Sequence, residues 1–138
     1  MQIPPTPDDE HDRLDSLRAI GLLDTSPEER FDRITRLASR LFDVPMALVT
    51  FVDADRQWFK SKVGTEADET PREHSFCGHA ILEPDVLLVA DAAQDVRFHD
   101  NPLVTGHPGI RFYAGCPIAA PDGALVGTVC VIDDRPRE

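Results

Sequence analysis

The stretch Ile110–Asp133, IRFYAGCPIAAPDGALVGTVCVID, decides the fold that this sequence predicts. Its two apolar runs are joined by Ala-Pro-Asp-Gly at 120–123, where the proline pre-sets φ and the glycine tolerates a positive φ. This combination predicts a β-hairpin. Only Gly127 and Thr128 interrupt the apolar run Leu125–Ile132, so we expect this strand to be covered on both faces of a sheet.

The first strand of the hairpin has one face of mixed chemistry. Arg111, Tyr113 and Gly115 alternate onto the same face of the sheet. A buried guanidinium and a buried phenol need hydrogen-bond partners, and a glycine lets another group approach closely. We therefore expect Arg111 and Tyr113 to meet a ligand, water or acidic residues across a cavity.

Two helices are expected before the first strand. Thr6 and Ser26 are the predicted N-caps, each followed by proline, and Gly21 suits the end of the first helix. The first helix has a thin apolar stripe beside many acids, which suits packing against its own sheet or against a second copy. The second helix is strongly amphipathic, and its apolar residues recur at helical spacing: Phe31, Ile34, Leu37, Ala38, Leu41 and Phe42.

The remaining segments predict an antiparallel sheet with the helices on one face. Met46–Val52 and Arg56–Val63 form a second hairpin, in which Trp58, Lys60 and Lys62 alternate onto a solvated face. Val86–Ala90 is a short buried strand. Residues 75–81 and 102–105 are expected short helices, and the polar segments 64–82 and 91–109 would roof a cavity on the other face of the sheet.

Composition narrows the class of protein. A chain of 138 residues suits one domain, and a net charge of −11 argues against a nucleic-acid or anionic-membrane surface. No long apolar run predicts a membrane span. Three widely spaced cysteines indicate a reducing, cytoplasmic setting rather than a disulfide framework or a zinc site. Because the chain stops directly after a strand, we expect it to be a domain of a longer protein.

The string Ser75–His79, SFCGH, has the most chemical character in the chain. Cys77 near a helix N-terminus suits a thiol nucleophile or redox sensor. The other interpretation, which we favour, is a small buried thiol and a hydrogen-bonded histidine, since residues 77 and 79 do not share a helix face. Cys116 and Cys130 lie in apolar strands and are expected in the core, and Asp91 and Asp95 suit caps of short helices. The histidines have no metal-ligand spacing.

Several strings, taken in order, resemble the GAF domains found at the N-terminus of bacterial sensor histidine kinases and diguanylate cyclases. The resemblance covers nearly the whole chain from about Thr6. The matching strings are SPEERF at 26–31, Trp58–Lys60 with Gly64, Thr70-Pro71-Arg72, SFCGHAI at 75–81, Val89–Asp91, DVRF at 95–98, Asn101–Val104, IRFYAG at 110–115 and GTVCVID at 127–133.

This resemblance implies an α+β fold with about six antiparallel strands, helices on one face and a roofed ligand pocket on the other. It implies a sensory domain at 23–138, preceded by a helical segment at 1–22 for which we expect a dimer contact. The implied partners are an unidentified small molecule, a covalently linked output domain and a second copy, with no nucleic acid and no membrane contact. The resemblance does not fix the ligand or any cofactor.

The expected site combines the resemblance with the residue patterns. The expected ligand-binding residues are Ser75, Cys77, His79, Asp91, Arg111 and Tyr113, and no metal ligand is expected. We expect no catalysis, because free methionine-sulfoxide reductases of this family need a cysteine pair and residues 91–109 contain none. Bilin attachment and cyclic-nucleotide binding are disfavoured, since Cys77 is followed by Gly78 and DVRFHD at 95–100 only partly matches the cyclic-nucleotide signature. A reductase using Cys77 and a purely dimerising module remain alternatives.

Overall fold

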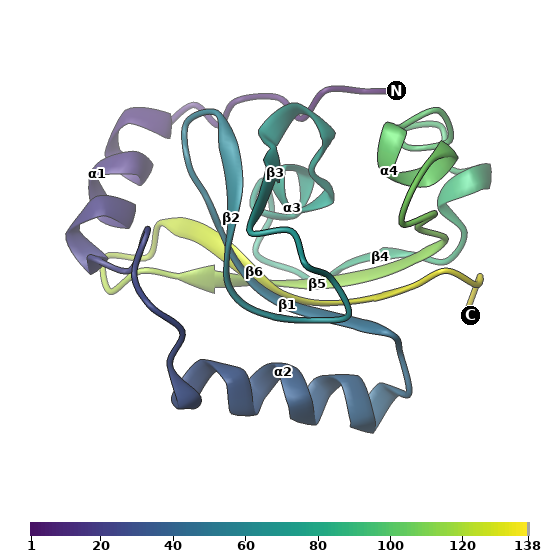
Figure 1. Ribbon diagram of the computed structural model, residues 1–138. Helices are drawn as coiled ribbons and strands as arrows, with labels where there is room; N and C mark the ends of the chain where they lie inside the picture. Colours follow the sequence, from purple (N-terminus) through teal and green to yellow (C-terminus); the bar gives the residue numbers. More distant parts are fainter. Residues whose placement is uncertain (138) are drawn as a thin grey trace.

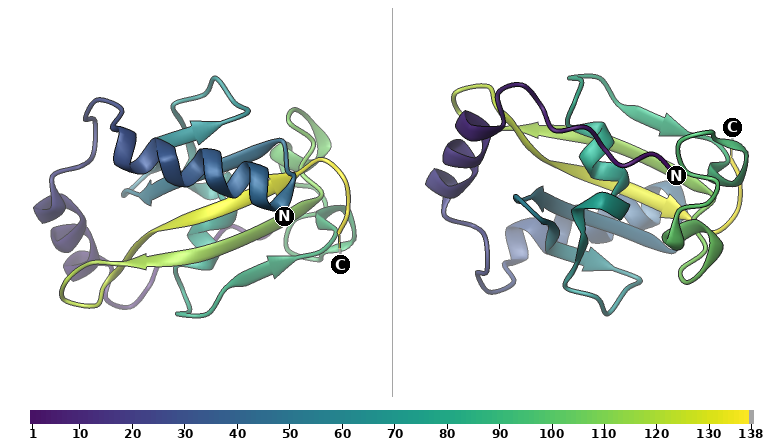
Figure 2. Two further views of the ribbon diagram at one scale, coloured as in Figure 1. Left: turned by 90° about the horizontal axis from the view of Figure 1, so that it is seen from below. Right: turned by 90° about the horizontal axis from the view of Figure 1, so that it is seen from above.

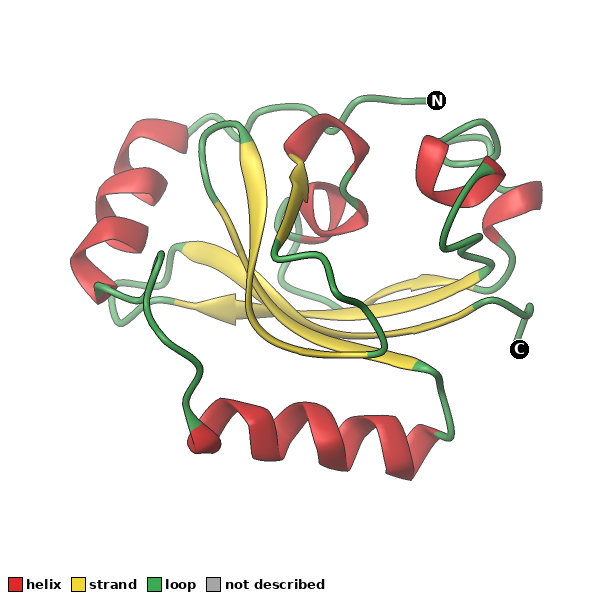
Figure 3. Cartoon of the chain, viewed as in Figure 1, coloured by secondary structure: helices red, strands yellow, loops and turns green. Residues whose placement is uncertain are grey.

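The computed structural model describes residues 1–137 and has a six-stranded antiparallel sheet between helical layers (Figures 1 and 3). The strand order is β3-β2-β1-β6-β5-β4, so β1 and β6 are central and β3 and β4 are the edges. The elements are α1 (Glu10–Ile20), α2 (Glu29–Phe42), β1 (Met46–Val52), β2 (Arg56–Val63), β3 (Glu69–Pro71), η1 (Arg72–His74), α3 (Phe76–Ala80), β4 (Leu87–Val89), η2 (Ala92–Gln94), α4 (Pro102–Thr105), β5 (Phe112–Ala119) and β6 (Leu125–Asp133).

The hairpin predicted from the decisive stretch is confirmed as β5 and β6. Gly123 has a φ of 91° in the turn, and the amide of Ala120 donates to the carbonyl of Ala124 at 2.8 Å. Strand β6 is buried at seven of its nine residues, as expected for a central strand covered on both faces.

The sheet lies between two unlike layers. Helix α2 crosses one face, over β1, β2 and β6, whereas α3, α4 and the long connections cover the other face (Figures 1 and 2). We call this second layer the roof. The sheet also contains β3, an edge strand paired with β2, which sequence periodicity missed because it has only three residues in a polar segment.

Helix α1 packs at one end of the sheet and is part of its own domain. The side chain of Leu17 is 1% exposed and joins Phe51, Trp58 and Val126 in a separate apolar cluster. Arg13 is equally buried, with Nη1 donating to the carbonyl of Val52 at 2.7 Å. The thin stripe therefore serves packing against the sheet, and a contact of α1 with a second copy stays a prediction.

Both long helices begin later than predicted. Helix α1 begins at Glu10 and α2 at Glu29, and neither makes a side-chain N-cap hydrogen bond, so the predicted caps Thr6 and Ser26 are wrong. The ammonium of Lys60 explains the second case, because it donates to the carbonyl of Ser26 at 2.6 Å and holds this residue outside the helix. The predicted end of α1 at Gly21, with φ 73°, is confirmed.

The predicted solvated face of β2 is wrong because α1 and the segment before α2 cover it, and a β-bulge also changes the alternation of the strand. Phe59 pairs with Thr50 and Ser61 with Val49, which leaves Lys60 as the extra residue. Lys60 is 3% exposed, and its ammonium contacts Glu28 at 2.7 Å as well as Ser26. The bulge thus gives this lysine a buried, fully paired position.

Some apolar residues expected in the core are exposed. Helix α2 packs through Thr35, which is buried, and leaves its outer apolar residues in solvent. The helix does not extend over the β5–β4 side of the sheet, so Cys116 on β5 and Leu88 on β4 are exposed there. The outer apolar residues of α2 are Ile34, Leu37, Leu41 and Phe42, which are 41%, 62%, 71% and 54% exposed.

Candidate functional site

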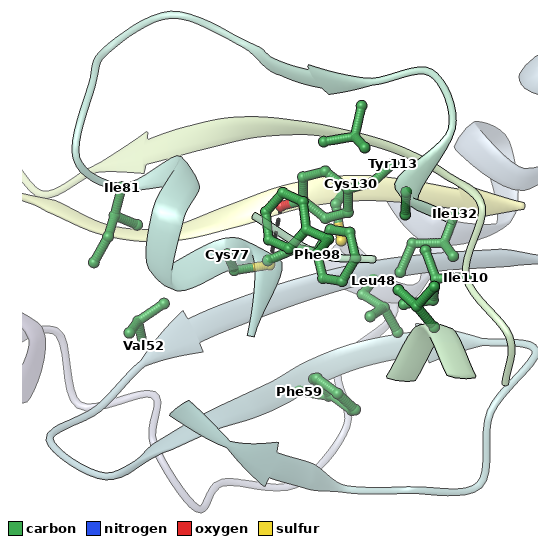
Figure 4. Close-up of a cluster of buried hydrophobic side chains, with 14 residues drawn as sticks. Leu48, Val52, Phe59, Cys77, Ile81, Phe98, Ile110, Tyr113, Cys130 and Ile132 are labelled. Carbon is green, nitrogen blue, oxygen red and sulfur yellow. Dashed lines mark hydrogen bonds between the residues drawn. The ribbon is translucent and has the colours of Figure 1, made fainter. Parts of the chain in front are cut away.

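A polar cluster lies in the apolar core between the sheet and α3, and consists of Cys77, Tyr113, Thr128 and Thr50. Figure 4 shows Cys77 and Tyr113 within this core. The sulfur of Cys77 lies 3.1 Å from the phenol oxygen of Tyr113 and 3.0 Å from the hydroxyl of Thr128. A further hydrogen bond of 3.0 Å joins the hydroxyls of Thr128 and Thr50. All four are at most 2% exposed, so their polar atoms find their partners inside the core rather than in solvent.

Local structure explains how these side chains meet. The hydroxyl of Ser75 accepts from the amide of Gly78 at 2.8 Å and starts α3, which places Cys77 on its first turn against the sheet. Thr50 and Thr128 lie directly opposite each other on the central strands β1 and β6. Because directly paired residues of antiparallel strands share a face, both hydroxyls point to the roof.

In this cluster the sulfur of Cys77 is surrounded by groups that can donate a hydrogen bond. Burial raises the pKa of the Cys77 thiol, but hydrogen bonds from Cys130, Thr128 and Tyr113 outweigh it and bring the pKa to about 7. Burial, with the charge on Cys77, raises the pKa of Tyr113 well above its usual range, so the phenol keeps its proton and donates. The sulfur of Cys77 is therefore the group that accepts a donor or a proton.

Two predicted site residues are helix caps in this structure. Ser75 caps α3, as described, and is 1% exposed. The carboxylate of Asp91 accepts from the amide of Ala93 at 3.1 Å and caps η2, which confirms the capping role predicted for it. Their contribution to ligand binding stays a prediction.

The other two predicted site residues contact main-chain carbonyls of the roof. His79 lies on α3, and its Nε2 donates to the carbonyl of Gln2 at 3.1 Å. Nη1 of Arg111 donates to the carbonyls of Val104 and Ile110 at 2.9 and 3.0 Å. The structure thus brings Cys77 and Tyr113 together, and places His79 and Arg111 elsewhere in the roof.

Sequence reasoning missed the hydroxyls of Thr50 and Thr128 in this cluster, and the buried side chain of Gln57 on β2. Thr50 and Thr128 were visible only as hydroxyls inside apolar strands, and Cys130 was taken as core, which its 1% exposure confirms. Gln57 is 5% exposed, and among the described residues its Oε1 is a buried side-chain oxygen with no hydrogen-bond partner. It pairs with Val52, whose side chain belongs to the core under the roof, so Gln57 faces that layer too.

The predicted cavity under the roof is filled by apolar side chains. They include Phe76 and Phe98, whose rings stack at 4.0 Å directly beside Tyr113. A groove of about 710 Å³ lies outside this layer, between α2, β2 and residues 24–27. Over residues 1–137, no group of three or more His, Cys, Asp or Glu side chains suits a metal ion. In the same part of the chain, no helix has the length and apolar character to span a membrane.

The strand order and the roofed layer agree with a comparison of the sequence with protein-family models, in which the GAF domain matches residues 26–138. The chain is a GAF domain. The predicted fold and the resemblance at the level of the family are therefore confirmed. Helix α1 precedes the matched region, although it packs on the same sheet.

This GAF domain is 47% identical over 137 residues to cyclic di-GMP phosphodiesterase PA2567 of Pseudomonas aeruginosa. The match covers 99% of the chain but only 23% of the relative, so the chain spans about a quarter of that protein. The domain thus belongs with those of signalling proteins, while the name of the relative describes a phosphodiesterase rather than the histidine kinase or diguanylate cyclase that the resemblance suggested.

Solved structures share the fold at low sequence identity. The GAF domain of an Acinetobacter phosphoenolpyruvate-protein phosphotransferase has a TM-score of 0.61 at 14% identity, covering 92% of this chain and 80% of that one. The free methionine-R-sulfoxide reductase of Neisseria meningitidis, solved with its substrate, has a TM-score of 0.64 at 14% identity, covering 93% and 75%. Identity this low supports the fold and not a shared activity.

Proposed function

We propose that this GAF domain is a sensory domain that binds a small polar molecule between the sheet and α3. The observation that carries the proposal is the polar cluster around Cys77, placed at the centre of an otherwise apolar layer. Buried polar groups of this kind fix the orientation of a ligand in a mainly apolar pocket. The unpartnered Oε1 of Gln57 in the same layer adds an acceptor for a ligand donor.

We further propose that the domain regulates a cyclic di-GMP phosphodiesterase. The 47% identity to the Pseudomonas aeruginosa protein supports this output, and the 23% share of that protein leaves most of its length for other parts. In this proposal the domain is regulatory and the reaction takes place elsewhere in the protein. A phosphodiesterase therefore replaces the kinase or cyclase as the output domain that we favour.

A thiol-based reductase remains the alternative function, in which Cys77 would react as a nucleophile instead of serving only as a buried hydrogen-bonding group. Its lowered pKa suits a nucleophile. Against this, Cys77 is 2% exposed on the face of α3 that packs on the sheet, and the long connection before β5 contains no second cysteine. We therefore assign Cys77 to ligand recognition.

We propose that the domain acts as a homodimer through α2. Ile34, Leu37 and Leu41 form an exposed apolar stripe on its outer surface, called the α2 stripe below. A stripe this exposed on one helix is typical of an interaction surface. We propose α2 rather than α1 for the dimer contact, because Leu17 and Arg13 of α1 are already buried in their own domain.

The sensory role is tested on the full-length protein with its output domain. Hydrolysis of cyclic di-GMP is measured with and without a low-molecular-mass extract of the host cells. The wild type should respond to the extract, whereas Tyr113→Phe and Thr128→Val should keep the basal rate and lose the response. Cys116→Ser is the matched control, since that thiol is exposed on β5. A wild type that ignores the extract, or variants that respond equally, would refute the proposal.

A further inference from the structure

Residues 1–6 run across the outer side of α3 before the chain enters α1, as the right-hand view of Figure 2 shows. We call this segment the latch. Most of it is exposed, and Ile3 is 60% exposed, but Pro4 is buried. An irregular N-terminal segment is usually mobile unless specific contacts hold it. The burial of Pro4 therefore directs attention to the contacts that hold the latch in place.

The first contact is a close approach between Pro4 and Gly78 of α3. A Cβ atom on residue 78 would lie 2.9 Å from Cγ of Pro4 and 2.8 Å from the capping hydroxyl of Ser75, both closer than real side-chain contacts allow. Glycine inside a helix costs about 1 kcal/mol relative to alanine. The close approach gives a physical reason for a glycine here, because it lets the latch lie directly on α3.

The second contact is a pair of hydrogen bonds at Gln2. The main-chain amide of Gln2 donates to the carbonyl of Arg97 at 3.0 Å, and its main-chain carbonyl accepts from Nε2 of His79 at 3.1 Å. One bond reaches α3 and the other reaches the connection that carries Phe98. The latch therefore joins two parts of the roof that lie over the same core, where Phe98 stacks on Phe76.

The far end of the latch is fixed by a buried ionic network in α1. Glu10 accepts from Arg72 at 2.7 Å, just before α3, and from Nε of Arg13 at 2.6 Å. Arg72 also donates to the carbonyl of Asp53 at 3.0 Å, in the β1–β2 turn. The latch is thus held at Gln2 and just beyond its end, with α3 and Cys77 beneath it.

We propose that the latch keeps α3 closed over the polar cluster, and that its release opens this layer. The purpose of the opening, entry of a small molecule, rests on the function proposed above, but the mechanical claim does not. Local opening of a small unit such as α3 needs far less free energy than global unfolding. Surface contacts such as those of the latch determine how large this free energy of opening is.

The test uses the buried thiol of Cys77 as a reporter of opening. In a Cys116→Ser background, which removes the exposed thiol, iodoacetamide labelling of Cys77 and Cys130 is followed by peptide mass spectrometry. Pro4→Asp puts a charge against Gly78, and Gln2→Pro removes the amide that donates to Arg97. Ile3→Asp is the matched control, because it adds the same charge at an exposed position of the latch.

In Pro4→Asp and in Gln2→Pro, iodoacetamide should label Cys77 at least about tenfold faster than in the background protein. The labelling rate of Cys130 should not change. Ile3→Asp should label Cys77 at the background rate. Equal acceleration of Cys77 and Cys130 would show global loosening and overturn the latch, as would no acceleration in either latch variant. If Pro4→Asp does not fold, Gln2→Pro decides.

The two proposals fail separately. Selective labelling of Cys77, combined with a full-length enzyme that ignores the cell extract, would leave the latch intact and refute the sensory function. If the full-length enzyme responds to the extract but Cys77 in the latch variants is labelled at the background rate, the sensory function would stand and the latch would be refuted.

Discussion

The phenol ring of Tyr113 lies over Gly115, two residues further along the same strand, so closely that a Cβ atom on residue 115 would come within 2.6 Å of the ring carbon Cζ. The sequence placed both residues on one face and predicted that the glycine admits a close neighbour. That neighbour is the tyrosine itself. Gly115 is therefore the reason that the phenol can reach Cys77.

Gly115→Ala should expel Tyr113 from the polar cluster. The added methyl group overlaps the ring, and such overpacking costs about 1–3 kcal/mol of the free energy of unfolding. Urea denaturation measures the loss, and the ultraviolet spectrum of the single tyrosine reports its environment. Gly123→Ala is a useful comparison, because its Cβ meets open space while its positive φ disfavours alanine. An unchanged tyrosine spectrum in Gly115→Ala would contradict the packing described here.

Tyr113→Phe should raise the pKa of Cys77 above about 7, since the phenol donates a hydrogen bond to its sulfur. The folded pKa lies below the ordinary 9.0, so the thiolate stabilises the fold above pH 9, and this contribution is lost as the pH falls through about 7. The variant should gain less stability over that range, and lose about 1 kcal/mol overall. Thiolate absorbance gives the pKa, with Cys77→Ser as the blank; an unchanged pKa would exclude the phenol as donor.

Glu10→Gln should destabilise the domain by about 3 kcal/mol, because it leaves the buried guanidiniums of Arg13 and Arg72 without a counter-charge. Burial already lowers the pKa of Arg13 against the opposing effect of Glu10. The free energy of unfolding in urea is the measurement, and Asp12→Asn, an exposed acid in the same turn, is the control. If both variants lose the same small amount, the network contributes no more than a surface charge does.

Leu37→Glu should convert the proposed dimer to a monomer with little loss of stability, since the side chain is 62% exposed. Light scattering after size-exclusion chromatography gives the mass. Val96→Glu introduces the same change at a 74% exposed position in the roof, and should leave the dimer intact. A dimer that survives Leu37→Glu would place the contact outside the α2 stripe.

Asp133→Asn should make the stability of the domain less sensitive to acid. Burial raises the pKa of Asp133, but hydrogen bonds that include one from Arg137 at 2.8 Å outweigh it and bring the pKa below the ordinary 3.8. The carboxylate therefore stabilises the fold above pH 3.8, and this contribution is lost as the pH falls through the lower, folded value. The variant should lose about 2 kcal/mol at neutral pH and show a shallower decline below pH 3.8. Asp55→Asn, an exposed control, should decline as the wild type does.

Local signals predicted the central part of the fold well. The turn at 120–123 and the short helices expected at 75–81 and 102–105 depend on residues close in sequence, and all three are confirmed. The face shared by Tyr113 and Gly115 followed from strand alternation alone. The contact of Tyr113 with Cys77 joins residues 36 positions apart, so strand alternation alone could not predict it.

Interactions between distant segments account for what the sequence did not predict. Lys60 holds Ser26 outside α2, so a good local capping signal did not form a cap. The bulge in β2 shifts its alternation, and strand periodicity cannot show where a bulge occurs. The α2 stripe was expected in the core because an amphipathic pattern does not reveal which element covers it. Thr50 and Thr128 meet only because β1 and β6 pair.

In the proposed function, the filled layer beneath α3 would also set how tightly a ligand can bind. A molecule that enters there is bound only by the open form, so its apparent dissociation constant equals the intrinsic constant divided by the open fraction. An open fraction of about 1% would weaken the apparent affinity about a hundredfold. Loosening residues 1–6 should then make the domain bind its ligand more tightly while making α3 easier to open. Affinity and local stability would therefore change in opposite directions, and the latch would determine the ligand concentration to which the domain responds.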